Sequence, residues 1–225
     1  MKHALFSDLH ASEVGLTKLL AHPAFKGAHK RICLGDVINA HDITTAAEYF
    51  VRVKDASDLI LRGNHEAVLT GQCDIAVFNP RVREAISNAK KQLETENGSL
   101  LQELSALVST YALGDMQLTH GSFNTANPWK HVRYTEDVQA EEGYMPSNVC
   151  VTAHGHIPFI AWQEEGLWYY QRQLYDSPFL LKRDTKWYVN TGSILGSREM
   201  RAYERTFLVY DDEARTVTFH NLEDT

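Results

Sequence analysis

The chain has 225 residues, of which 44% are hydrophobic, so it can bury a sizeable core and fits a single domain spanning residues 1–225. Its formal net charge of -7 argues against an extended nucleic-acid surface, which would need clustered lysines and arginines. No run approaches the roughly 18 consecutive apolar residues of a membrane span, and the N-terminus leaves no room for a signal peptide. We therefore expect a cytoplasmic protein.

Short apolar runs alternate with helical patterns in the first third of the chain. The apolar spacing predicts strands at 3–7, 31–35 and 58–62, with helices near 13–21 and 43–54 between them. This alternation is typical of parallel strands joined by right-handed crossovers.

Residues 79–108 change to a helical period of apolar residues, with Asn97-Gly98 as a break between two helices. From residue 116 onward the pattern is mostly strand and predicts a second, more antiparallel sheet. The expected later strands are 157–163, 167–172, 186–190, 206–210 and 216–220, with a hairpin turn at 211–214.

Between a predicted strand that ends at His120 and one that begins near Asn148, residues 122–147 read as a long loop, of the kind that often forms a lid or specificity segment. Together the patterns predict an α/β fold, a four-layer αββα sandwich in which two mixed sheets pack face to face and helices cover both outer faces.

Five apolar runs end in metal-binding side chains, where a strand would end: HALFSDLH, RICLGD, LILRGNHE, MQLTH and VCVTAHGHIPF. Active sites of layered α/β folds lie where strand ends converge, so one shared pocket is expected. The side chains concerned are those of Asp8, His10, Asp36, Asn64, His65, His120, His154 and His156.

Imidazole, carboxylate and amide ligands without thiolates suit manganese, zinc or iron. Seven possible ligands exceed the needs of one ion with an open position, so two divalent or trivalent ions sharing a carboxylate are expected. Only Asp8 and Asp36 of this set are anionic, so two dications would leave a net positive site suited to phosphate esters.

This motif series resembles the calcineurin-like metallophosphoesterase superfamily, from Asp8-Leu9-His10 to His154-Gly155-His156, with Asn190-Thr191-Gly192-Ser193 similar to a loop beside the family's site. The resemblance implies that Asp8, His10 and His156 hold the first metal, Asp36 bridges, and Asn64, His120 and His154 hold the second. It also implies that His65 contacts the substrate phosphate and acts as a general acid.

The expected activity is hydrolysis of a phosphate ester through in-line attack by a metal-bridging hydroxide. Gly35-Asp36-Val37-Ile38-Asn39 lacks the Asp-Arg continuation of serine/threonine protein phosphatases and resembles small bacterial and archaeal phosphodiesterases. A phosphodiesterase or nucleotide phosphohydrolase is thus favoured over a phosphomonoesterase, including a protein phosphatase. A non-catalytic binding scaffold of the same fold is the alternative from another class, and the retained His65 argues against it.

Further residues are candidates for binding the substrate, a nucleotide being one option. His41 follows Asp36 in the same loop, His131 and Arg133 lie in the lid candidate, and Arg198 follows the Asn190–Ser193 loop. The sequence does not specify an oligomeric state.

Overall fold

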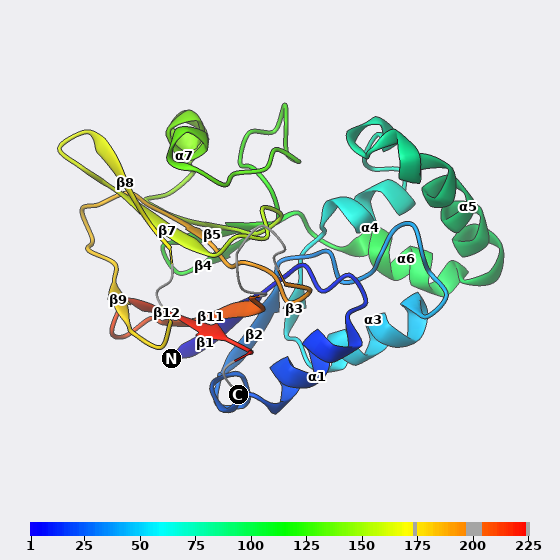
Figure 1. Cartoon of the computed structure of the whole chain (residues 1–225), viewed down its shortest axis with the longest axis horizontal. Helices are drawn as coiled ribbons and strands as arrows, with labels where there is room; N and C mark the ends of the chain where they lie inside the picture. Colours follow the sequence, from blue (N-terminus) through cyan, green and yellow to red (C-terminus); the bar gives the residue numbers. More distant parts are fainter. Residues whose placement is uncertain (173–174, 197–203, 224–225) are drawn as a thin grey trace.

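The computed structural model describes residues 1–172, 175–196 and 204–223 (Figure 1). A first sheet of six strands has the order β3-β2-β1-β11-β12-β9. Its three N-terminal strands are parallel, and the remaining neighbours are antiparallel. The bounds are β1 Lys2–Phe6, β2 Lys30–Cys33, β3 Leu59–Ile60, β9 Phe179–Leu180, β11 Thr206–Asp211 and β12 Thr216–Asn221.

The second sheet also has six strands, in the order β4-β5-β6-β10-β7-β8. Its central strands β5, β6 and β10 are parallel, and antiparallel pairs flank them. The bounds are β4 Thr110–Leu113, β5 Met116–Thr119, β6 Val149–Thr152, β7 Phe159–Glu164, β8 Leu167–Gln171 and β10 Trp187–Asn190.

The helices form three groups in chain order. The first group is α1 Glu13–Ala21, α2 Pro23–Lys26 and α3 Ala46–Asp55. The second is α4 Asn64–Leu69, the 3-10 turn η1 Ile75–Val77, α5 Pro80–Glu96 and α6 Gly98–Ala106. The third is α7 Thr135–Glu141 with the 3-10 turn η2 Glu142–Tyr144. Figure 1 shows α4, α5 and α6 gathered at one end of the molecule, beyond the edge strand β3.

Three apolar clusters separate the layers, and the two-residue period of the strands explains them. In β1, Ala4 and Phe6 pack into a cluster with α1 and α3, whereas Leu5 between them faces the second sheet. In β6, Val151 faces the first sheet, while Cys150 packs outward with α7. Figure 1 accordingly shows α1 and α3 on one side of the paired sheets and α7 on the other.

This architecture confirms the predicted fold class of two mixed sheets flanked by helices. The predicted helical excursion is confirmed too, because α5 ends at Glu96 and α6 begins at Gly98. Among the described residues, no helix has the length and apolarity needed to cross a membrane.

Two assignments were wrong. The strands predicted at 206–210 and 216–220 belong to the first sheet, because β11 pairs with β1 instead of extending the second sheet. The segment 122–147 is not a loop throughout, since it contains α7, whose Val138 is buried against the second sheet. The strand predicted at 58–62 is reduced to Leu59–Ile60.

Gly192 offers a test of the packing between the second sheet and β11. Its φ of 78° is left-handed, and a Cβ there would lie 1.8 Å from Thr206 Oγ1. We expect Gly192→Ala to lower the free energy of unfolding by roughly 1–3 kcal/mol, measured by urea denaturation. Gly98→Ala is the control, because an added Cβ meets no atom within 4 Å. Equal losses in both variants would contradict this account.

Candidate metal centre

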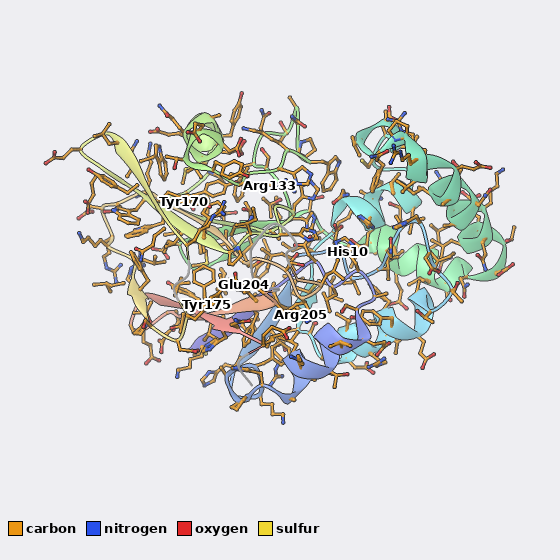
Figure 2. All side chains as sticks on the ribbon, viewed as in Figure 1. His10, Arg133, Tyr170, Tyr175, Glu204 and Arg205 are labelled. Atoms are coloured by element: carbon orange, nitrogen blue, oxygen red, sulfur yellow. The ribbon has the colours of Figure 1, made fainter. Side chains whose placement is uncertain are left out.

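The predicted site residues converge where strands of both sheets end. Asp8 and His10 follow β1, Asp36 follows β2, His120 follows β5, and His154 and His156 follow β6. Asn64 and His65 differ slightly from the prediction, since they are the first two residues of α4 and not the end of a strand. Figure 2 shows His10 on the side of the sheets that faces the α4–α6 helices.

Three overlapping groups have donor atoms close enough to hold a metal ion, with all atoms of a group within 4.8 Å of one another. They are Asp8, His10 and His156; His10, Asp36 and His65; and Asp36, His120 and His154. In the first, Asp8 Oδ1 lies 3.1 Å from His156 Nε2. In the third, Asp36 Oδ2 lies 3.3 Å from His120 Nε2.

Asn64 extends the third group, because its Oδ1 lies 3.2 Å from His120 Nε2. Asp36 Oδ2 also lies 3.7 Å from His10 Nε2, on the side of the first group. The seven predicted ligands therefore form two adjacent clusters with Asp36 between them.

The carboxylates provide a test of whether a cation fits. Asp8 Oδ2 accepts a hydrogen bond from the backbone N–H of His154 at 3.1 Å. Asp8 Oδ1 is buried and makes no well-aligned hydrogen bond among the described residues, and its near neighbour is the imidazole nitrogen Nε2 of His156 at 3.1 Å. A buried anionic oxygen that faces imidazole nitrogens would be satisfied by a metal ion bound between them. The donor set thus fits a metal.

Hydrogen bonds to backbone carbonyls fix which nitrogen faces the site in two of the histidines, His120 and His154. His120 Nδ1 donates to the carbonyl of Leu34 at 2.9 Å, so Nε2 faces the site and offers a lone pair once its proton is lost. His154 Nε2 donates to the carbonyl of Trp129 at 3.0 Å, which leaves a lone pair on Nδ1. Both rings are therefore prepared to act as ligands.

His65 has the opposite arrangement. Its Nδ1 accepts a hydrogen bond from the backbone N–H of Ala40 at 2.9 Å, so the neutral ring carries its proton on Nε2. That nitrogen lies 4.0 Å from Asp36 Oδ2, at the centre of the site. Although His65 meets the distance condition for a metal group, this tautomer is a donor, not a ligand.

Charges in the site are strongly coupled. Burial lowers the pKa of His65 to about 3 despite the nearby Asp36 carboxylate, so the ring is neutral. Burial would also lower the pKa of His120, but Asp36 and Asp8 raise it to about 9. In the absence of a cation, a proton on His120 offsets the carboxylates, and metal binding would release that proton.

The backbone at the site is unusual. Five of the predicted ligands have φ between 46° and 60°, in the left-handed region: Asp8, His10, Asp36, His154 and His156. Non-glycine residues adopt this conformation rarely and mainly when the surroundings enforce it. The loop at residues 190–195 supplies part of that support, because Ser193 Oγ and the N–H of Leu195 both donate to the carbonyl of Asp8.

Glu66 was given no role by the sequence analysis, although it stands in the Gly63–Glu66 motif. Its buried carboxylate accepts the backbone N–H groups of Gly63, Asp36, Val37 and Ile38, at 2.8–3.2 Å. Four donated hydrogen bonds favour the ionised form, whereas burial and the charge of Asp36 raise the pKa of Glu66 to about 7. The side chain ties the Asp36 loop to the start of α4.

A sequence model of the calcineurin-like phosphoesterase superfamily domain matches residues 1–215. The chain belongs to this superfamily. An uncharacterized protein of Methanocaldococcus jannaschii, MJ0912, is 25% identical over 217 residues, which cover 93% of this chain and 82% of that protein.

Solved structures share the fold. A metallophosphoesterase from Sphaerobacter thermophilus superposes with a TM-score of 0.74 at 21% identity, covering 98% of this chain and 88% of its own. A candidate diadenosine tetraphosphatase gives a TM-score of 0.54 at 14% identity, covering 98% and 93%. As a calcineurin-like phosphoesterase, the chain is a phosphoric ester hydrolase of a metal-dependent family.

The candidate substrate residues of this phosphoesterase occupy different places. A cavity of about 480 Å³ opens over the metal groups, and both His41 and His131 line it. His131 also supports a predicted ligand, because its ring stacks on His154 at 4.0 Å between centroids and its Nδ1 donates to the His154 carbonyl. Arg133 lies beside Gly155 but does not line the cavity. Arg198 lies outside the described residues.

Four apolar residues that the sequence analysis did not assign to the site also line this cavity: Val77, Phe78, Trp129 and Leu195. Trp129 lies in the lid candidate at 122–147, where its sequence position offered an aromatic surface for a base. Nothing local in the sequence marks the other three, because each is an ordinary apolar residue brought to the site by the fold.

Metal binding should stabilise the phosphoesterase measurably. We expect manganese added to chelator-treated protein to raise the melting temperature, since a ligand at 100 times its Kd contributes about 2.7 kcal/mol. Asp36→Asn should abolish most of this shift, because it removes the carboxylate that both clusters share. Asp184→Asn, at an exposed turn, is the control. An unchanged melting temperature in the unsubstituted protein would refute a metal centre.

Proposed function

We propose that this phosphoesterase hydrolyses a phosphodiester or a nucleotide at the paired clusters described above. The observation that carries the proposal is the placement of His65 Nε2, a neutral N–H donor, beside a carboxylate that lies between two sets of metal-ligand side chains. When bound, two divalent ions would acidify water and offset the charge of the phosphoryl oxygens.

In this proposal Asp8, His10 and His156 hold one ion, while Asn64, His120 and His154 hold the other, with Asp36 shared. The oxygen and nitrogen donors suit manganese, iron or zinc. Hydrogen bonds between these side chains and the backbone orient the ligand atoms in advance, so little rearrangement accompanies metal binding.

His65 would donate its Nε2 proton to the leaving oxygen as the bond to phosphorus breaks, and it would regain a proton from the one that the attacking water releases. Its position is fixed by the Ala40 N–H at Nδ1 and by its own backbone N–H, which donates to Asp36 Oδ1 at 3.0 Å. The low pKa of His65, about 3, keeps the ring neutral and therefore able to donate only from Nε2.

Two features favour a diester or nucleotide over a phosphoprotein. The positions after Asp36 are Val37, Ile38 and Asn39, and Asn39 lines the cavity where protein phosphatases carry an arginine-bearing motif. The name of one structural neighbour, a candidate diadenosine tetraphosphatase, is consistent with a nucleotide. Phosphomonoester hydrolysis is the alternative, and a non-catalytic scaffold is disfavoured because His65 is retained beside a full ligand set.

The proposal predicts turnover of p-nitrophenyl phosphate or its bis ester in the presence of manganese. Activity should disappear on chelation and return when the metal is restored, because the chain's side chains alone do not provide enough positive charge to offset a phosphoryl group. Comparing the two esters separates the monoesterase from the diesterase. Absence of chelator-sensitive turnover of either ester would refute the proposed function.

Replacing His65 with alanine should lower kcat by roughly 10²–10⁴ while leaving the bound metal content unchanged. The loss should be larger for a phenyl ester than for a p-nitrophenyl ester, because the better leaving group needs less help from an acid. His29→Ala, at an exposed histidine far from the cavity lining, is the matched control. Equal losses for both esters would remove His65 as the proton donor.

A further inference from the structure

One side of the cavity over the metal groups carries apolar side chains that the proposed chemistry does not use. Val77 and Phe78 line it, and Val77 is 52% exposed. A single exposed valine needs no explanation on a surface. Here, however, it is next to a phenylalanine at the rim of the cavity over the proposed metal groups, where apolar side chains do nothing for a phosphate.

The turn that presents this pair is firmly held. Asp74 Oδ1 accepts the N–H of Ala76 at 2.8 Å. From α5, the guanidinium of Arg83 donates to the carbonyls of Phe78 and Ala76, at 2.9 Å and 2.8 Å. Val77 and Phe78 are therefore positioned by hydrogen bonds to their backbone and leave apolar surface toward the cavity.

Phe78 contacts the proposed proton donor directly. Its ring meets the ring of His65 edge to face, with centroids 5.2 Å apart and an angle of 70°. Because His65 would protonate the leaving oxygen, the group attached to that oxygen must extend from the neighbourhood of His65. Phe78, in contact with His65, is an apolar wall on that path.

The rim also offers polar contacts near the same histidine. Asn39 and His41 line the cavity on either side of Ala40, whose N–H holds His65 Nδ1. An alkyl leaving group would use the apolar wall and leave these polar groups unmatched. A heterocyclic base uses both the apolar wall and the polar groups, because its face stacks on an aromatic ring and its edge forms hydrogen bonds.

We infer that Val77 and Phe78 form the subsite for the leaving group and that this group is a nucleoside, with its base against Phe78. The inference rests on the proposed function and specifies its substrate. In the reaction a water oxygen bonds to phosphorus and the bond from phosphorus to the nucleoside oxygen breaks. His65 supplies the proton that the departing oxygen takes up, and the proton lost by water returns to His65 Nε2 by way of solvent, so the ring ends neutral as it began.

The test compares substrates that differ only in the base: adenosine 5′-phosphate against ribose 5-phosphate, and the methyl esters of both. The manganese-loaded protein should favour the adenosine member of whichever pair it hydrolyses. Phe78→Ala should lower kcat/KM for that member about tenfold, the scale of one base stacked on an aromatic side chain, and change the ribose member less than twofold. Equilibrium binding of adenosine 5′-phosphate should weaken in parallel.

Phe78→Leu keeps apolar bulk against the core without an aromatic face, and Phe78→Tyr keeps the face. The tyrosine variant should retain the preference for the base and the leucine variant should lose it. Val14→Ala, at an exposed valine of α1 that does not line the cavity, is the control.

Equal losses for both members of a pair would overturn the inference, because Phe78 would then act only by supporting His65. Failure to hydrolyse either pair, in a protein that turns over p-nitrophenyl esters with manganese, would overturn it and leave the proposed function standing. If p-nitrophenyl esters are not hydrolysed either, both the proposed function and the inference fail.

Discussion

The metal centre depends on one buried carboxylate that would bind no metal. Glu66 gathers four backbone N–H groups from two separate segments, the loop after β2 and the turn before α4. Since Asp36 lies in the first segment and Asn64 and His65 in the second, the shared carboxylate, an amide ligand and the proton donor become one rigid unit. The space between the segments is fully used, because a Cβ on Gly63 would lie 2.1 Å from Asp36 Oδ1.

Ligand chemistry was readable from the sequence because it is local. Each of Asp8, Asp36, His120 and His154 follows a short apolar run within a few residues, and the strands they follow do converge. Sheet membership was not readable, because the apolar pattern of β11 fits a strand in either sheet and only its pairing with β1 decides. The contributions of Glu66 and Phe78 likewise depend on contacts that bring distant segments together.

The segment 122–147 also shows what the sequence pattern alone does not predict. Its polar composition predicted a lid, yet much of it supports the site from outside. The carbonyl of Trp129 orients His154, and the ring of His131 stacks on the same histidine. A buried hydrogen bond of 2.6 Å from Ser122 Oγ to Glu141 joins the start of the segment to α7, and Val138 of α7 packs against the second sheet. Composition distinguishes a loop from a strand, but it does not distinguish a lid over the site from a segment that supports the site from outside.

The left-handed backbone at five proposed ligands narrows which residues those positions can accept. Aspartate, asparagine and histidine enter this conformation more readily than most side chains, and all three are also metal ligands. The left-handed backbone and metal coordination therefore favour nearly the same few residue types at these positions. A branched residue at Asp36 or His154 would deform the loop as well as remove a donor. A chain of this kind could therefore lose its metals with least disruption by exchanging one of these residue types for another. Such an exchange would leave the fold intact and alter the metal centre.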